Sequence, residues 1–230
     1  MGRGFVDRVL LSILKCMVRG SVCGWSLEQS ARKRGALRIA GIDEVGRGPL
    51  FGPVVAAAVI LPKGCRLHGL TDSKKLSEKK RNELDVEIRA CAVAWAVAAV
   101  DAETIDRINI RRASLEAMRR AVEMLAQGPD FLLPDFLLID GRDTIEWDCA
   151  QQAVIQGDAT SFSIAAASVL AKVHRDRMMV EFDAVFPGYG LARHKGYCSA
   201  EHMEALRRLG PTPLHRRSFQ PVAQTFLHFD

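Results

Sequence analysis

The sequence predicts an α/β fold with a mixed sheet flanked by helices. Short apolar runs of strand length alternate with longer stretches in which apolar residues recur at helical spacing. The first two apolar runs follow one another across a short Gly-rich turn, and later runs are interspersed with helical stretches. Two neighbouring strands followed by a mixture of strands and helices indicate a layered, partly antiparallel sheet.

Composition limits the class of protein. The chain has 230 residues, of which 48% are hydrophobic and 26% charged, enough for one core and a small appendage. A net charge of +5 and a pI of about 9.0 favour a polyanionic partner such as nucleic acid. The longest apolar run, residues 90–100, is too short to span a bilayer. We therefore expect no membrane association.

The cysteines give no sign of a metal site or a disulfide framework. The chain has six of them, and none are spaced as C-x-x-C or accompanied by a zinc-type His pair. Several lie in apolar surroundings, as Cys91 does. We expect reduced, buried thiols in a cytoplasmic protein.

The first part of the chain divides into an extension and the start of the body. Residues 1–35 are expected to form an N-terminal extension that is flexible or helical; a transit peptide or a start codon placed too early are alternatives. The body is predicted to cover residues 36–222, with a short tail at 223–230. It begins with strands at about 37–44 and 53–61, joined by a Gly-Arg-Gly-Pro turn.

The remaining elements follow from apolar spacing and from capping and stop signals. Ser77 and Ser199 are each placed to cap a helix, and Gly-Pro or Pro-Gly pairs mark three helix ends. The predicted elements are helix 77–90, strand 92–100, a helix containing 115–125 that ends at Gly128, strands 136–139 and 153–156, helix 161–186 and helix 199–209.

Four acids stand where predicted strands end. Asp43 and Glu44 close the first strand, Asp140 closes a later one, and Asp158 lies between a strand and a helix. Strand ends often gather at one edge of an α/β sheet. Two carboxylates about 4 Å apart repel by roughly 4 kcal/mol at an effective dielectric near 20. Their pKa values therefore rise, or a hard divalent cation, Mg²⁺ or Mn²⁺, neutralises them. An ordinary turn or cap role is the alternative for any single acid.

Adjacent strand residues point to opposite faces, so Glu44 shares this site only where the strand ends or bulges. The turn Gly46-Arg47-Gly48 does not match a dinucleotide-binding motif, because it leads into a strand. It is read instead as a tight turn whose backbone approaches a ligand, or as a plain hairpin turn.

Basic residues and one tyrosine complete the candidate site. Each alone is typical of a solvated surface, but together they form a set able to hold phosphates and stack on a sugar or base. His202 and His215 are expected at the surface. The basic and aromatic candidates are Arg47, Lys74, Lys75, Lys172, Arg175, His194, Lys195 and Tyr197.

Successive segments of the chain resemble the motifs of the type 2 ribonuclease H family, ribonuclease HII, in the family's order from about residue 39 to 221. These segments are AGIDEVGRGPLFGPVVAAAVIL, LTDSKKLSEKKR, INIRRAS with AMRRAV, LLIDGRD, GDATSFSIAAASVLAKVHRDRMM, PGYGLARHKGY and GPTPLHRRSF. The resemblance implies a ribonuclease H-like fold with a C-terminal helical extension. It also implies endonucleolytic cleavage of the RNA strand of RNA–DNA hybrids and of duplex DNA at embedded ribonucleotides.

The resemblance further implies a site. Its metal-binding and catalytic acids fall on Asp43, Glu44, Asp140 and Asp158, with Mn²⁺ or Mg²⁺ as cofactor and two-metal-ion hydrolysis that leaves a 5′-phosphate and a 3′-hydroxyl. The turn Gly46, Arg47 and Gly48 matches the element that reads the 2′-hydroxyl. Tyr197 matches the tyrosine that stacks at the ribonucleotide junction. Lys74 and Lys172 are predicted to bind substrate, and a monomer is expected.

The chain departs from the family pattern in its first 35 residues, at Cys198-Ser199 and at Arg111-Arg112. These differences concern substrate preference and leave the four acids intact. Two other hypotheses are a non-catalytic hybrid-binding module and a different nuclease of this fold, such as a Holliday-junction nuclease or transposase. Loss of an acid would favour the first, and absence of the DSKKL and HKGY segments the second.

Overall fold

In the computed structural model of the protein, residues 23–127 and 133–226 are described. Their helices, short 3₁₀ helices (η) and strands are, in order, α2 (Ser26–Lys33), β1 (Ile39–Val45), β2 (Val54–Ile60), η1 (Ser73–Lys75), α3 (Glu78–Cys91), β3 (Ala94–Val100), α4 (Ala102–Ile108), α5 (Ile110–Ala126), β4 (Phe136–Asp140), β5 (Ala150–Val154), η2 (Gly157–Ala159), α6 (Phe162–Val185), α7 (Leu191–His194), α8 (Ala200–Leu209) and α9 (Gln220–Phe226).

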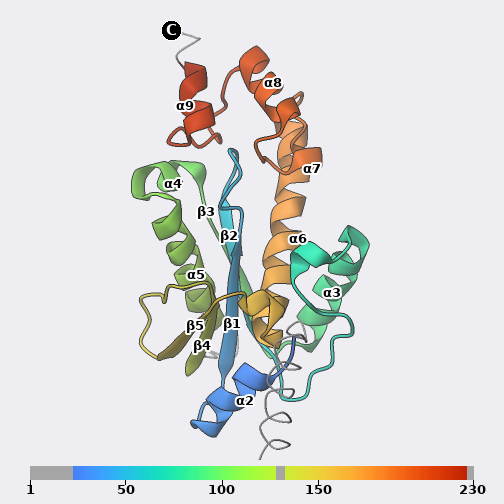
Figure 1. The fold of residues 1–230 in the computed structure, drawn as a ribbon, viewed down its shortest axis with the longest axis vertical. Helices are drawn as coiled ribbons and strands as arrows, with labels where there is room; N and C mark the ends of the chain where they lie inside the picture. Colours follow the sequence, from blue (N-terminus) through green and yellow to red (C-terminus); the bar gives the residue numbers. More distant parts are fainter. Residues whose placement is uncertain (1–22, 128–132, 227–230) are drawn as a thin grey trace, which may run out of the picture.

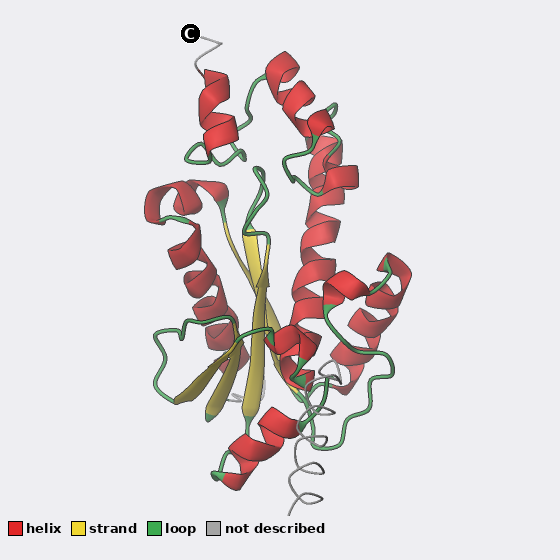
Figure 2. Cartoon of the chain, in the orientation of Figure 1, coloured by secondary structure: helices red, strands yellow, loops and turns green. Residues whose placement is uncertain are grey.

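The described strands form one five-stranded sheet in the order β3-β2-β1-β4-β5. β2 is antiparallel to both β1 and β3, whereas β4 is parallel to β1, and β5 is parallel to β4. A short turn suffices to join β1 to β2, while a parallel partner for β1 requires a long crossover, here built from α3, β3, α4 and α5. Figures 1 and 2 show the twisted sheet between helices. The prediction of a mixed, partly antiparallel sheet is confirmed.

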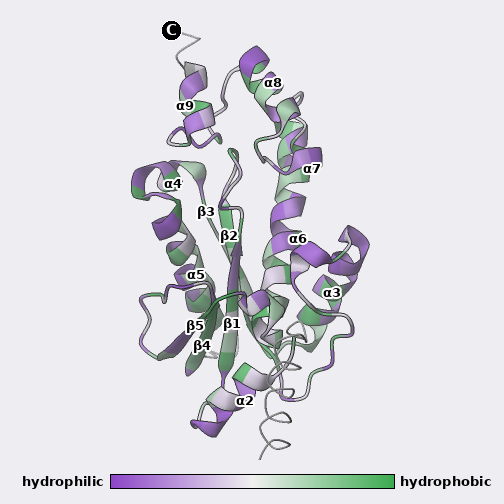
Figure 3. Ribbon diagram, in the orientation of Figure 1, coloured by the Kyte–Doolittle hydropathy of each residue, from purple (hydrophilic) through white to green (hydrophobic). Residues whose placement is uncertain are grey.

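The sheet separates two hydrophobic cores. α5 packs on one face and α6 on the other (Figure 1). Because alternate strand residues point to opposite faces, Ile42 of β1 joins the α5 core, whereas Val55 and Ala57 of β2 join the α6 core. Figure 3 shows hydrophobic residues concentrated on the central strands. The strands are held by burial on both sides, which explains their nearly continuous apolar sequences.

Small residues allow α6 to pack closely on β1. Gly41 faces the start of this helix, and a methyl group in its place would collide with the backbone of Ser163. The helix begins at Ser161, whose Oγ accepts a hydrogen bond from the Ile164 N–H at 3.2 Å. Its buried residues 165–167 are all alanine. This contact brings α6 against the face of β1 on which Asp43 lies, with Ser168 of α6 near that carboxylate.

The second half of α6 extends beyond the sheet toward α7 and α8 (Figure 1). A third core forms there. It contains Leu50 and Phe51 of the β1–β2 turn, Met179 of α6, and buried residues of the C-terminal region such as Tyr189 and Leu206. The C-terminal helices therefore pack against the turn that follows Asp43 and Glu44, and the expected C-terminal helical extension is present.

α2 lies within the segment expected to be an extension, and it packs on the body. Glu28 is 1% exposed, and its Oε1 accepts hydrogen bonds from the Ser161 hydroxyl (2.6 Å), the Ser163 hydroxyl (2.6 Å) and the Ser163 N–H (2.9 Å). The carboxylate thus lies at the N-terminal end of α6, where the helix dipole favours a negative charge. The division into extension, body and tail stays a prediction, and residues 1–22 and 227–230 lie outside the described residues.

Several details differ from the sequence prediction. β5 spans 150–154 instead of 153–156, and the short helices α2, α4, α7 and α9 had no separate prediction. The predicted helix end at Gly128 lies outside the described residues. His202 and His215 are buried, so their predicted surface position is wrong. The described cysteines are free thiols; most are half-buried, but Cys198 is exposed, contrary to prediction.

Candidate active site

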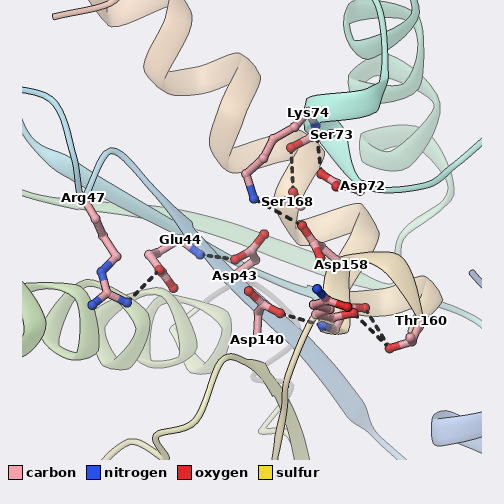
Figure 4. A network of polar contacts seen from close by, with 12 residues as sticks. Asp43, Glu44, Arg47, Asp72, Ser73, Lys74, Asp140, Asp158, Thr160 and Ser168 are labelled. Carbon is pink, nitrogen blue, oxygen red and sulfur yellow. Dashed lines mark hydrogen bonds and ion pairs between the residues drawn. The ribbon is translucent and has the colours of Figure 1, made fainter. Parts of the chain in front are cut away.

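The four predicted acids come from three neighbouring strand ends. Asp43 and Glu44 lie near the end of β1, Asp140 is the last residue of β4, and Asp158 lies in η2, just after β5. Because β1, β4 and β5 are parallel and adjacent, their carboxyl ends meet at one edge of the sheet. Figure 4 shows the four side chains in this region, beside the start of α6.

Asp43 and Glu44 leave β1 on different faces. The ladder with β2 continues through Val45 without a bulge, and Glu44 lies opposite Ala56, a residue of the α5 core. Asp43 points toward α6, is 4% exposed and accepts the Glu44 N–H at 2.7 Å. Glu44 is the second-last residue of the strand, and its carboxylate faces Arg47 at 3.4 Å. Its position near the strand's end leaves it within electrostatic reach of Asp140, whose charge helps to raise its pKa.

Asp140 and Asp158 are fixed by the segment that joins β5 to α6. Oδ1 of Asp140 accepts the Gly157 N–H at 2.6 Å, which ties the end of β4 to η2. Asp158 is 6% exposed, and its Oδ2 lies 3.4 Å from Nζ of Lys74. A methyl group at Gly157 would meet the Cδ1 atom of Ile164 on α6 at 2.5 Å, so that side chain would have to shift.

The polar loop around η1 brings Lys74 to this edge. Asp72 accepts the Lys74 N–H at 2.9 Å, which forms the start of η1. The Ser73 and Ser168 hydroxyls share a buried hydrogen bond of 2.7 Å that ties the loop to α6. Lys74 itself is exposed, so its ammonium faces both Asp158 and solvent. This loop was predicted as polar, but its anchoring serine pair was not.

Burial and mutual repulsion shape the electrostatics of the acids. Burial is the main cause that raises the pKa of Asp43 well above its ordinary value. The charges of Glu44, Asp140 and Asp158 raise that pKa further, while the Ser168 hydroxyl opposes the shift. The site is therefore short of positive charge at neutral pH.

The other shifts have the same origin. Burial raises the pKa of Glu44, against the opposing charge of Arg47. Burial and then Asp140 raise the pKa of Asp158, against Lys74. Burial alone would lower the pKa of Lys74, but the nearby acids, Asp158 first, outweigh it and raise that pKa. Lys74 and Arg47 thus compensate only part of the negative charge.

The donor set fits a hard divalent cation. All four side chains offer carboxylate oxygens, with no thiol or imidazole, which is the chemistry that Mg²⁺ and Mn²⁺ prefer. In their present positions no three His, Cys, Asp or Glu side chains of the described residues form a ready cage for one ion. Glu44 and Asp158 are turned toward cationic side chains instead. Ions of this kind retain waters and take substrate phosphate as a ligand, so a complete protein cage is not required.

The predicted substrate-binding residues separate into two groups. The turn Gly46-Arg47-Gly48 lies next to Tyr197. A methyl group added at Gly48 would be in van der Waals contact with a carbon of that ring, at 3.6 Å. Gly46 has φ +94°, a conformation that favours glycine. Lys172, in contrast, pairs with Asp176 at 2.7 Å along α6. Among the described residues, no hydrogen bond or ion pair joins Lys172 to the four acids.

Sequence reasoning missed the buried polar residues behind this turn. Arg216 donates to the carbonyls of Gly46 and Arg47, and His202 donates from Nδ1 to the Tyr197 carbonyl. The segment around Arg216 reads as a basic, solvated tail, and no local pattern distinguishes it from one. Only its proximity to the β1–β2 turn indicates its place in the site.

Comparison with known proteins assigns the family. The ribonuclease HII family profile matches residues 40–222. A ribonuclease HII of Geobacter sulfurreducens is 53% identical over 200 residues, covering 87% of this chain and 90% of its own. Within the described residues, none of the helices has the length and apolar character needed to cross a membrane.

Solved structures share the fold. The ribonuclease H2 of Pyrococcus horikoshii aligns with a TM-score of 0.71 at 24% identity, covering 84% of this chain and 99% of its own. A Bst ribonuclease HIII in complex with Mn²⁺ aligns with a TM-score of 0.69 at 21% identity, covering 86% and 72%. The ribonuclease H-like fold is thereby confirmed. With the family profile spanning most of the chain and a relative more than half identical, this protein belongs to the ribonuclease HII family.

Proposed function

We propose that Asp43, Glu44, Asp140 and Asp158 form the catalytic metal site through which this protein acts. As a ribonuclease HII, the protein cleaves the RNA strand of RNA–DNA hybrids and cuts DNA at embedded ribonucleotides. The observation that carries the site proposal is the convergence of the four acids at the carboxyl ends of β1, β4 and β5, with the pKa of buried Asp43 raised by burial and by the other three.

The cofactor we propose is Mn²⁺ or Mg²⁺, held by the four carboxylates. The Mn²⁺ complex of the related ribonuclease HIII and the all-oxygen donor set support this choice. When bound, two such ions would activate the attacking water and stabilise the leaving 3′-oxygen, which leaves a 5′-phosphate and a 3′-hydroxyl. Asp43 is the most buried of the four, and the charges of the other three all raise its pKa, so it is the residue most suited to anchor the ions.

The chain's own residues hold the substrate. Lys74 is exposed beside Asp158 and is placed to contact a phosphate; Arg47 is exposed on the other side, beside Glu44. The backbone of Gly46, Arg47 and Gly48 reads the 2′-hydroxyl, the group by which RNA differs from DNA. Tyr197, 46% exposed and next to Gly48, stacks on the sugar or base at the junction. Lys172, which pairs with Asp176 on α6, is proposed to bind substrate on the sequence prediction alone.

The test is cleavage of duplex DNA that carries one ribonucleotide, with Mg²⁺ or Mn²⁺, by wild type and by Asp43→Asn. The amide keeps the shape and removes the charge, so cleavage should be lost while hybrid binding persists. Asp143→Asn is the matched control, since Asp143 follows the same strand as Asp140 but pairs with Arg111 at 2.6 Å. Normal turnover by Asp43→Asn would refute the assignment.

The same substrate separates the protein from other nucleases of this fold, because a junction-cutting enzyme would prefer a four-way junction to a single-ribonucleotide duplex. A monomeric state and a cytoplasmic location remain predictions of this proposal. Sedimentation with and without substrate would test the first.

A further inference from the structure

Among the residues that the structure describes, two arginines are completely buried, and both lie behind the β1–β2 turn. Arg175 of α6 and Arg216 are both 0% exposed. Burial lowers the pKa of Arg175 to about 10, and burial together with the charge of Arg175 lowers the pKa of Arg216 to about 9, so both stay charged at neutral pH. Neither forms a salt bridge with a carboxylate in the described part of the chain. A buried charge of this kind is tolerated only if it is well hydrogen-bonded.

Arg216 directs its hydrogen bonds at the backbone of the turn. Its Nη2 donates to the carbonyl of Gly46 at 2.6 Å, its Nη1 to the carbonyl of Arg47 at 3.0 Å and its Nε to the carbonyl of Gly52 at 3.0 Å. The ring of Phe219 covers the guanidinium, with 5.1 Å from Cζ to the ring centroid. All three donor nitrogens therefore fix main-chain carbonyls on both sides of the turn.

Holding these carbonyls inward determines where the next amides point. In a planar trans peptide the C=O and the following N–H point in opposite directions, and the described residues contain no cis peptide bond. The N–H groups of Arg47 and Gly48 are therefore directed away from the guanidinium of Arg216. Neither of them has a hydrogen-bond partner among the described residues, and both residues are exposed.

Arg175 secures the neighbouring chain segments. It donates to the carbonyls of Phe51 (3.0 Å) and Pro53 (3.1 Å) and to that of Lys195 (2.9 Å), so it joins the turn to the loop that carries Tyr197. The Leu50 N–H donates to the Gly196 carbonyl at 2.8 Å and strengthens this connection. The two free amides and the tyrosine ring thus share one rigid support.

We propose that Arg216 is a positioning residue for ribose recognition: it orients the peptide units after Gly46 and Arg47 so that the N–H groups of Arg47 and Gly48 face the 2′-hydroxyl. This inference rests on the proposed reading of the 2′-hydroxyl by this turn. The cationic partner also polarises the two peptide units, which strengthens their N–H groups as donors. A lysine is not equivalent, because one ammonium does not reproduce the planar fork that reaches three carbonyls.

The experiment measures ribose selectivity, defined as the ratio of affinities for duplex DNA with one ribonucleotide and for the same duplex without it. Binding is measured with Ca²⁺, an ion for all-oxygen sites, so that turnover does not interfere. The variants are Arg216→Lys, which keeps the charge, and Arg216→Met, which removes it. Arg207→Met is the control, since this arginine is exposed on α8 and pairs with Glu204 there. Thermal unfolding is recorded for each.

We expect Arg216→Lys to lose about tenfold in selectivity, the effect of weakening one hydrogen bond to the ribose, with affinity for the all-DNA duplex nearly unchanged. In turnover assays its KM for the single-ribonucleotide substrate should rise more than its kcat falls. If Arg216→Met does not fold, Arg216→Lys decides. A folded Arg216→Lys with wild-type selectivity would overturn the positioning role alone. A wild-type protein without selectivity would instead refute ribose reading by the turn, and the inference with it.

Discussion

The Nε2 atoms of His202 and His215 lie 3.0 Å apart at a place where both side chains are almost fully buried. Nδ1 of His215 accepts the Thr212 N–H at 2.9 Å, so the proton of His215 is on Nε2. That proton is donated to His202, whose own proton on Nδ1 is donated to the Tyr197 carbonyl at 2.9 Å. This chain of bonds accommodates two neutral rings. A further proton would place two N–H groups against each other.

The histidine pair should make the protein sensitive to mild acid. Burial lowers the pKa of His202 to about 4 and that of His215 to about 3. Both values lie below the unfolded value of about 6.5, so the unfolded chain binds more protons as the pH falls. Stability is therefore present above about pH 6.5 and is lost toward pH 4, by up to about 1.4 kcal/mol per pH unit per histidine.

Denaturant unfolding at several pH values checks this. His202→Asn keeps a donor for the Tyr197 carbonyl but does not titrate, so its loss of stability between pH 7 and 5 should be smaller. His68→Asn, at an exposed histidine, should behave as wild type. The acids of the site have raised pKa values and act in the opposite sense, but all three proteins share them. Equal pH dependence in His202→Asn and wild type would contradict the prediction.

Removing the charge of Asp43 should stabilise the metal-free protein while abolishing cleavage. Because burial and neighbouring acids raise the pKa of Asp43, its ionised form is unfavourable at neutral pH. The free energy of unfolding of Asp43→Asn should therefore exceed that of wild type by on the order of 1 kcal/mol.

Adding Mn²⁺ should raise the free energy of unfolding of wild type by about 2.7 kcal/mol when the ion is present at a hundred times its Kd. The same addition should raise that of Asp43→Asn much less. Thermal unfolding with and without Mn²⁺ measures both effects. A variant that Mn²⁺ stabilises as strongly as wild type would argue against the site.

Lys74 and Lys75 offer a matched test of phosphate contact. The two are adjacent and exposed, but only Lys74 faces an acid of the site, Asp158 at 3.4 Å. Lys74→Ala should weaken hybrid binding and reduce the slope of log affinity against log salt by about 0.9, as for one lost phosphate contact on duplex DNA. Lys75→Ala should leave the slope near that of wild type. Equal changes in both variants would indicate only a diffuse basic surface.

Glu28 should be important for stability although it lies outside the predicted body. Glu28→Ala removes an acceptor that three donors of Ser161 and Ser163 share. The free energy of unfolding should fall by roughly 2–4 kcal/mol, since buried donors lose a charged partner. Glu103→Ala, at an exposed position in the first turn of α4, should change it by less than about 0.5 kcal/mol. Similar stability of the two variants in urea unfolding would show that α2 contributes little.

The convergence of the acids was predictable because its cause is local to each segment. Asp43 and Asp140 each end an apolar run, and parallel strands bring such ends to one edge. The helix predicted over residues 161–186 is likewise present as α6, although its packing against β1 in particular was not predicted. The sequence also indicated hard-ion chemistry, since all four candidate ligands are carboxylates.

The tertiary structure alone decided which polar groups are buried and what they contact. Arg216 lies 170 residues from Gly46 along the chain, yet donates to its carbonyl. His215 and Glu28 likewise meet their partners only in the folded protein. A basic or acidic residue in a polar segment reads as solvated, because periodicity and capping act over a few residues. Burial of such a group depends on which distant segments pack against it, and the hydrogen bonds that compensate for lost water exist only after that packing has formed.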